Sequence, residues 1–178
     1  MTNNNHQIIH EKKTIKILGI GNLLYQDEGL GIHILPLLRE CFDGQDDVEV
    51  IEGATDGILL LDPVEATDHL IIVDAIHAGV QPGDLITVRD EEIPLYMGVK
   101  MSIHQVGFQE VLAAAKLRER LPRHMLMCGI QPHSLELGLE LTDVAQAKLP
   151  ELVSLIQQQV DEWRSILAHG ERERGGNA

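Results

Sequence analysis

Two adjacent carboxylates, Asp27 and Glu28, follow the first apolar segment of the chain and are its clearest candidates for chemistry. That segment ends at Gly19-x-Gly21, and a short loop separates it from the two acids. Carboxylate oxygens bind divalent cations, whereas phosphate groups are bound by backbone amides and positive charge. This turn is therefore expected to suit a cation better than an anion.

The Gly19-x-Gly21 pair also suggests a nucleotide site, but the rest of that signature is missing. Position 24 is Leu, where a dinucleotide fingerprint needs its third glycine. No Gly-Lys-Ser/Thr follows, so the pattern excludes a P-loop. A nucleotide-binding module is kept only as an alternative.

Further donors for a cation must come from other loops. Asp74 closes the apolar run 70–73, and His104 stands just before a segment with helical periodicity. Two carboxylates and one imidazole suit a first-row divalent ion and leave coordination positions open. We therefore predict that Glu28, Asp74 and His104 converge on one metal ion. Each also has an ordinary explanation: Asp27 or Glu28 as a helix cap, Asp74 as a turn residue and His104 as a helix-start residue.

Strands that alternate with helices would position these side chains. The pattern predicts an α/β fold, a three-layer sandwich with a mainly parallel twisted sheet flanked by helices. Ligands of such sheets bind beyond the carboxyl ends of the strands, where Glu28 and Asp74 should both emerge. Pro36 should kink or break its helix. The predicted strands are 14–21, 48–52, 69–74, 85–89 (an exposed edge) and 125–130, and the predicted helices are 29–42, 58–65, 105–118 and 149–167.

Length and composition indicate a single domain, 1–178, with flexible tails at 1–13 and 169–178. A formal net charge of −14 argues against nucleic acid or an anionic membrane as partner. Cys41 and Cys128 stand far apart and are interpreted as buried, reduced residues. With no signal peptide or membrane-length apolar run, the expected location is cytoplasmic.

Four segments together resemble the nickel–iron hydrogenase maturation endopeptidases. The likeness runs from about Thr14 to Leu155, and 89–94 is similar to members that serve membrane-bound uptake hydrogenases. The four segments are Gly19-Ile-Gly21-Asn22-Leu-Leu-Tyr-Gln-Asp27-Glu28-Gly29-Leu-Gly31, Gly53-Ala-Thr55-Asp-Gly57, Asp74-Ala75 and Ser102-Ile-His104-Gln105.

The resemblance implies an endopeptidase, grouped with aspartic-type peptidases, that removes the C-terminal extension of the nickel-loaded hydrogenase large-subunit precursor. In that family the residues matching Glu28, Asp74 and His104 bind nickel, which the substrate supplies and which acts as a recognition element. Zinc or cadmium could substitute in vitro. The implied partner is the precursor, and the enzyme is expected to be a monomer.

Other positions carry weaker predictions. Asp27 is a candidate base, although a cap is the commoner role for such a residue, and no nucleophile is assigned. Thr55, between Gly53 and Gly57, is a candidate for holding the precursor. Relatives commonly have glycine where this chain has Ala54, which predicts an ordinary backbone conformation there. His77 and His133 are interpreted as loop residues.

Three other functions stay open from the sequence alone. They are a nickel-recognising maturation factor without enzymatic activity, a nucleotide-binding module, and an unrelated α/β amide hydrolase that needs no nickel.

Overall fold

The computed structural model describes residues 15–54, 56–93 and 103–175, with 103–106 and 170–175 described by their backbone alone. Strands and helices alternate along most of the chain, as the apolar pattern predicts. The elements in order are β1 (Ile15–Ile20), η1 (Gln26–Gly29), α1 (Leu30–His33), α2 (Leu35–Cys41), β2 (Val48–Ala54), η2 (Gly57–Leu60), α3 (Leu61–Glu65), β3 (His69–Ala75), β4 (Leu85–Arg89), α5 (Ile103–Leu117), β5 (His124–Ile130) and α6 (Asp143–Gly175).

The five described strands form one sheet in the order β2-β1-β3-β5-β4. Neighbouring strands pair in parallel except β4, which runs antiparallel to β5 at the edge. The predicted mainly parallel sheet and its 85–89 edge strand are therefore confirmed. The chain leaves β1 toward β2 on one side and later returns to β3 on the other, so β1 and β3 flank the point where the connection direction switches.

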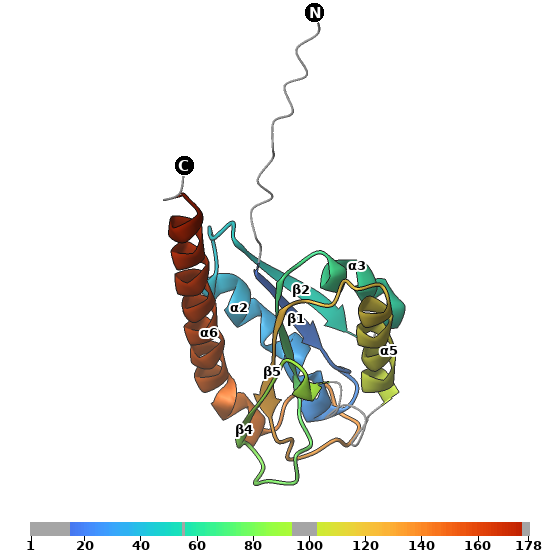
Figure 1. The fold of residues 1–178 in the computed structure, drawn as a ribbon. Coiled ribbons are helices and arrows are strands. Elements are labelled where there is room, and N and C mark those ends of the chain that lie inside the picture. Colours follow the sequence, from blue (N-terminus) through green and yellow to red (C-terminus); the bar gives the residue numbers. More distant parts are fainter. Residues whose placement is uncertain (1–14, 55, 94–102, 176–178) are drawn as a thin grey trace, which may run out of the picture.

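Helices cover both faces of the sheet and give three layers (Figure 1). Helices α1, α2 and α6 pack on one face, and η2, α3 and α5 on the other. Alternation along β1 divides its side chains between the two cores, because successive residues point to opposite faces. Ile15 and Ile17 join the first core, and Leu18 and Ile20 join the second.

Two helices differ in extent from their sequence predictions. The helix predicted over 29–42 is broken at Ile34, because Pro36 lacks an N–H and sits in the first turn of α2, as expected. Helix α6 starts at Asp143 and continues to Gly175 with Pro150 inside it. Residues 169–175 are therefore helical, which corrects the predicted tail at its start; 1–13 and 176–178 lie outside the described residues.

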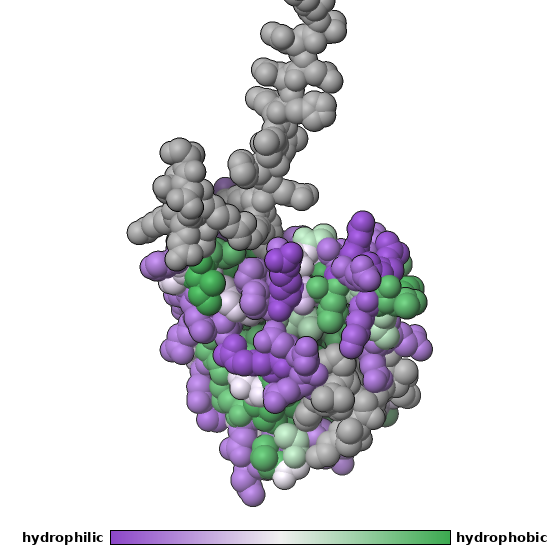
Figure 2. Space-filling view, in the orientation of Figure 1, coloured by the Kyte–Doolittle hydropathy of each residue, from purple (hydrophilic) through white to green (hydrophobic). Residues whose placement is uncertain are grey.

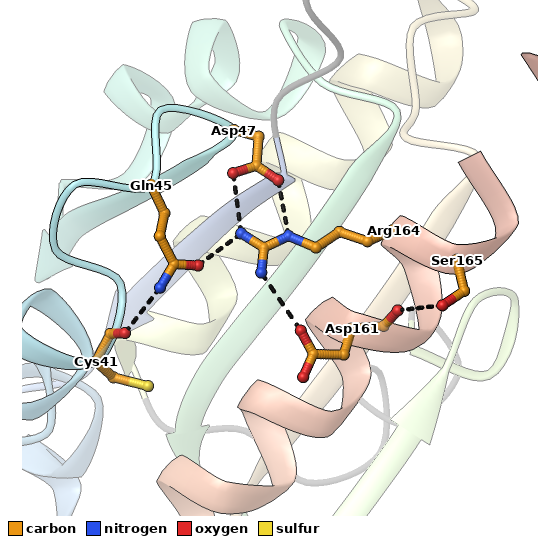
Figure 3. Close-up of polar contacts among 6 residues, drawn as sticks. All are labelled: Cys41, Gln45, Asp47, Asp161, Arg164 and Ser165. Atoms are coloured by element: carbon orange, nitrogen blue, oxygen red, sulfur yellow. Dashed lines mark hydrogen bonds and ion pairs between the residues drawn. The ribbon is translucent and has the colours of Figure 1, made fainter. Parts of the chain in front are cut away.

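An arginine ties α6 to the loop before β2 (Figure 3). The Nε and Nη2 atoms of Arg164 donate to the two oxygens of Asp47 at 2.7 and 2.9 Å, and Nη2 also donates to Oε1 of Gln45 at 2.6 Å. Asp161, one helical turn earlier, accepts from Nη1 at 3.3 Å. The Asp47 carboxylate is the main cause that raises the pKa of Arg164. This network fixes the long helix against the amino end of the sheet.

On the face shown in Figure 2, polar and hydrophobic side chains alternate, and the hydrophobic ones gather in separate groups. No helix among the described residues is long and apolar enough to cross a membrane. The two cysteines are free. Cys128 is buried as expected, whereas Cys41 is only half-buried, because it closes α2 at the margin of the core.

Candidate functional site

Two of the predicted ligands lie at the carboxyl end of the sheet, in segments that belong to neighbouring strands. Glu28 lies in η1, which follows β1, and Asp74 is the next-to-last residue of β3. β1 and β3 pair in parallel, and η1 lies against β3. Asp74 is buried, with Oδ1 accepting from the Ala75 N–H at 2.8 Å, and Glu28 is half-buried. Both acids therefore flank the switch point of the sheet, where ligands of open α/β folds bind.

The glycines of the first loop serve close backbone packing. A Cβ on Gly19 would lie 2.0 Å from the carbonyl oxygen of Gly31, and one on Gly21 would lie 2.2 Å from that of Glu28. A Cβ on Gly31 would meet the carbonyl oxygens of Ile20 and Val73, each at 2.2 Å. These contacts hold η1 and the start of α1 directly on the ends of β1 and β3, which explains the Gly-x-Gly without a nucleotide.

The third predicted ligand, His104, is the second residue of α5. Helix α5 packs on η2, and a Cβ on Gly107 would lie 3.5 Å from the Cα of Gly57. Because η2 follows β2, the first turns of α5 lie at the same end of the sheet as Glu28 and Asp74. The His104 side chain lies outside the described part of the structure.

Among the residues described, no group of three or more His, Cys, Asp or Glu side chains could hold a metal ion. The three-ligand site predicted from the sequence therefore depends on the His104 imidazole. The site stays a prediction. The backbone is compatible with it, because Glu28, Asp74 and the first turns of α5 lie at the same end of the sheet.

The segment after β2 differs from its sequence prediction at one residue. Ala54 has φ +41°, a left-handed conformation, although an ordinary one was predicted. The pairing of β1 with β2 shifts register here, since Gly19 pairs with Glu52 and Ile20 with Ala54, and the carbonyl of Ala54 accepts from the Gly21 N–H at 3.1 Å. The backbone therefore keeps a glycine-like conformation where the side chain is alanine.

The candidate substrate-binding residues lie in the same segment. Gly53 is buried, and a Cβ there would lie 2.8 Å from Cδ1 of Leu18. Gly57 has φ +52°, and a Cβ there would meet no described heavy atom within 4 Å. Thr55 lies outside the described residues. The two glycines thus have separate structural roles, packing for Gly53 and backbone conformation for Gly57, and binding of the precursor stays a prediction.

Asp27 joins the first loop to the segment after β5. Its carboxylate is fully buried and accepts from the backbone N–H groups of His133, Ser134 and Thr142 at 2.8, 3.2 and 2.8 Å. It also accepts from the Thr142 hydroxyl at 2.9 Å. No side-chain hydrogen bond caps α1, so the predicted cap is wrong. These four bonds favour a positioning role over the candidate role as a base.

Gln131 has a comparable role that spacing did not reveal. Its buried Oε1 accepts from the N–H groups of Ala78, Gly79 and Val80, so it fixes the loop that follows Asp74. Its Nε2 lies 3.1 Å from Nδ1 of the exposed His77. In the sequence, the only indication of this role was that Gln131 is a polar residue directly after a buried strand. His77 and His133 are both exposed loop residues, as predicted.

Fold and site together define an α/β protein whose switch point presents carboxylates. Such an edge can bind a divalent cation, and the loop after β1 carries neither the third glycine nor the Lys-Ser/Thr of nucleotide-binding loops.

Comparison with known proteins agrees with this class. The family model described as hydrogenase maturation protease matches residues 32–159. The hydrogenase expression/formation protein HoxM of Azotobacter vinelandii is 47% identical over 76% of this chain and 66% of its own length. The hydrogenase 2 maturation protease of Escherichia coli is 38% identical over 76% of this chain and 83% of its own length. The chain belongs to the hydrogenase maturation protease family.

Solved structures of such proteins share the fold. The hydrogenase maturating endopeptidase HybD from Escherichia coli superposes with a TM-score of 0.78 at 34% identity, covering 84% of this chain and 93% of that one. The [NiFe] hydrogenase maturation protease HybD from Thermococcus kodakarensis gives a TM-score of 0.69 at 27% identity, over 82% and 98% of the two chains. The predicted α/β architecture and the predicted family are both confirmed.

Proposed function

We propose that this protein is the endopeptidase that removes the C-terminal extension from the nickel-loaded precursor of a nickel–iron hydrogenase large subunit. The observation that carries the proposal is that Glu28, in η1 after β1, and Asp74, near the end of β3, lie at the same end of two neighbouring parallel strands. Family membership supplies the reaction class and the hydrogenase precursor as substrate.

In this proposal the nickel ion belongs to the substrate. Glu28, Asp74 and His104 complete its coordination, while thiolates of the precursor supply the other ligands. Oxygen and imidazole donors suit a borderline divalent ion, and zinc or cadmium can take its place in vitro. Binding the ion fixes the nearby peptide bond against the carboxyl end of the sheet, so a diffusive encounter becomes a positioned one.

The reaction is hydrolysis of one peptide bond. The oxygen of water attacks the scissile carbonyl carbon, and the C–N bond breaks. The amine of the departing peptide takes a proton, and the large subunit keeps a new C-terminal carboxylate. Backbone donors or the ion must stabilise the oxyanion. Asp27 already accepts four hydrogen bonds, so we assign it no proton transfer.

Cleavage of the nickel-loaded precursor tests this function. Purified protein and precursor are mixed, and the mass of the large subunit is followed by mass spectrometry. Loss of the extension is expected, whereas an unchanged mass would favour a nickel-recognising factor without peptidase activity. Equal cleavage of nickel-free precursor would point to a hydrolase that does not need the ion.

Substitutions test the ligands. His104→Ala, Glu28→Gln and Asp74→Asn should each abolish or severely slow processing while the protein stays folded. His124→Ala is the matched control, because this exposed histidine lies at the opposite end of the sheet, where β5 begins. Normal processing by His104→Ala would remove that residue from the site.

A further inference from the structure

Two loops at the carboxyl end of the sheet expose a group of large apolar side chains. Leu24 is 56% exposed, Leu137 78% and Leu139 63%. One loop follows β1 and the other follows β5, and they meet at a parallel bridge between Tyr25 and Gly138. We call this group the leucine ridge; its members are Leu23, Leu24, Tyr25, Leu135, Leu137 and Leu139.

Backbone hydrogen bonds join the two loops of the ridge. The Gln26 N–H donates to the carbonyl of Gly138 at 2.8 Å, and the Gly138 N–H donates to the carbonyl of Leu24 at 3.0 Å. Nε2 of His33, on α1, lies 3.0 Å from the carbonyl oxygen of Leu139. Gly138 permits this approach, because a Cβ there would lie 2.8 Å from Cγ of Gln26. The backbone that carries the exposed leucines is therefore held in place.

The buried carboxylate of Asp27 anchors the same two loops. Its bonds to His133, Ser134 and Thr142 hold both ends of the second loop against the first. Ordering loops costs conformational entropy, and here the ordered backbone places apolar side chains in solvent. An exposed apolar group that is held rigid marks a surface for a partner.

The ridge is continuous with the proposed active site. A Cβ on Gly29 would lie 3.2 Å from Cδ2 of Leu23, and Gly29 directly follows Glu28. The surface that a macromolecule meets at Glu28 therefore continues to Leu23, the nearest member of the ridge.

Charge decides between possible occupants. Glu136 and Glu140 are exposed beside the ridge, and the chain carries a formal net charge of −14. A second copy would bring these like charges together, which opposes association. A different protein with an apolar patch bordered by basic residues fits this surface.

We infer that the leucine ridge docks the body of the hydrogenase large-subunit precursor, through an apolar patch beside the nickel-bearing segment. This inference rests on the proposed function. It assigns the ridge to substrate affinity and Glu28, Asp74 and His104 to the reacting end.

Charge-introducing variants test the ridge. Leu137→Asp and Leu24→Asp are compared with Leu117→Asp, because Leu117 is 87% exposed at the last residue of α5, outside the ridge. Binding of nickel-loaded precursor is measured in the Glu28→Gln background, and kcat and KM of cleavage in the otherwise unaltered protein. Each ridge variant should weaken binding and raise KM by about 10- to 30-fold, with kcat little changed, as for residues central to an interface. Thermal unfolding of all three variants should match the parent.

The outcomes separate the two ideas. Ridge variants that bind and cleave like Leu117→Asp would overturn the docking inference and leave the proposed function standing. Loss of precursor binding only in the ridge variants would support docking even if no cleavage were seen, in which case the proposed function alone would fail. Sedimentation of the protein alone as a dimer that Leu137→Asp dissociates would assign the ridge to a second copy and overturn the inference. Absence of any precursor binding by the Glu28→Gln protein without a ridge substitution would also overturn the inference.

Discussion

Replacing Asp27 with Asn separates a positioning role from a role in proton transfer. Oδ2 of Asp27 accepts three hydrogen bonds and Oδ1 accepts one, and all four donors belong to the segment after β5. The least costly orientation of Asn places its NH₂ group at the Oδ1 position, facing the Thr142 N–H. One charge-assisted bond is then lost, at about 1.5–3 kcal/mol, and a buried donor is left unsatisfied, at about 1–3 kcal/mol.

Asp27→Asn should therefore lower the free energy of unfolding by about 2–4 kcal/mol, allowing for partial relaxation of the loop. For a chain of this size the loss corresponds to a fall in Tm of about 5–15 °C. Thermal unfolding measures the stability, and precursor cleavage is assayed well below both transitions. The folded variant should still process the precursor.

Asp43→Asn is the matched control, since it makes the same chemical change at an exposed residue. It should alter stability by less than about 0.5 kcal/mol. The reasoning is refuted if Asp27→Asn keeps the parental Tm and loses all cleavage, because Asp27 would then act in the chemistry.

Three further predictions follow from backbone geometry and burial. Ala54→Gly should raise the free energy of unfolding by about 0.5–1 kcal/mol in chemical denaturation, because relief of a left-handed alanine exceeds the entropic cost of glycine; a loss of stability would contradict the strain at this turn. Gly31→Ala should destabilise by about 3 kcal/mol or more and slow precursor cleavage, since its Cβ would overlap two strand carbonyls; normal stability would mean that α1 can shift freely. Burial raises the pKa of Cys128 to about 12, so alkylation at pH 8 followed by mass spectrometry should label Cys41 first and Cys128 only on unfolding. The folded protein keeps the Cys128 thiol protonated to a higher pH than the unfolded chain does. The contribution of this thiol to the free energy of unfolding should therefore be constant below the ordinary pKa of 9.0 and fall as the pH rises from there toward 12.

Local patterns predicted the architecture because each carries its own physical cause. Continuous apolar runs gave β1, β3 and β5, alternation identified β4 as an edge strand, and Pro36 marked the break between α1 and α2. Glu28 and Asp74 could be assigned to one end of the sheet because parallel strands all end there.

Features that depend on contacts distant in sequence were missed. The partners of Asp27 lie more than 100 positions away, and those of Gln131 more than 50, so spacing could not distinguish an anchor from a cap or a base. The conformation of Ala54 accompanies a register shift in the pairing of β1 with β2, which no property of alanine indicates. Helix α6 begins before its predicted start at Leu149, because Ala145 packs in the core with Leu149 and this packing outweighs the helix-breaking tendency of Pro150.

The bond between Asp27 and Thr142 spans 115 positions, which has a consequence for biosynthesis. While the polypeptide is still emerging from the ribosome, β1 and its loop exist, yet the donors that hold Asp27 have not been made. Contacts of such long range form late in folding. The protease should therefore gain a competent surface for its precursor only after the chain as far as Thr142 has emerged from the ribosome, so that shorter nascent chains neither sequester nor cleave the precursor.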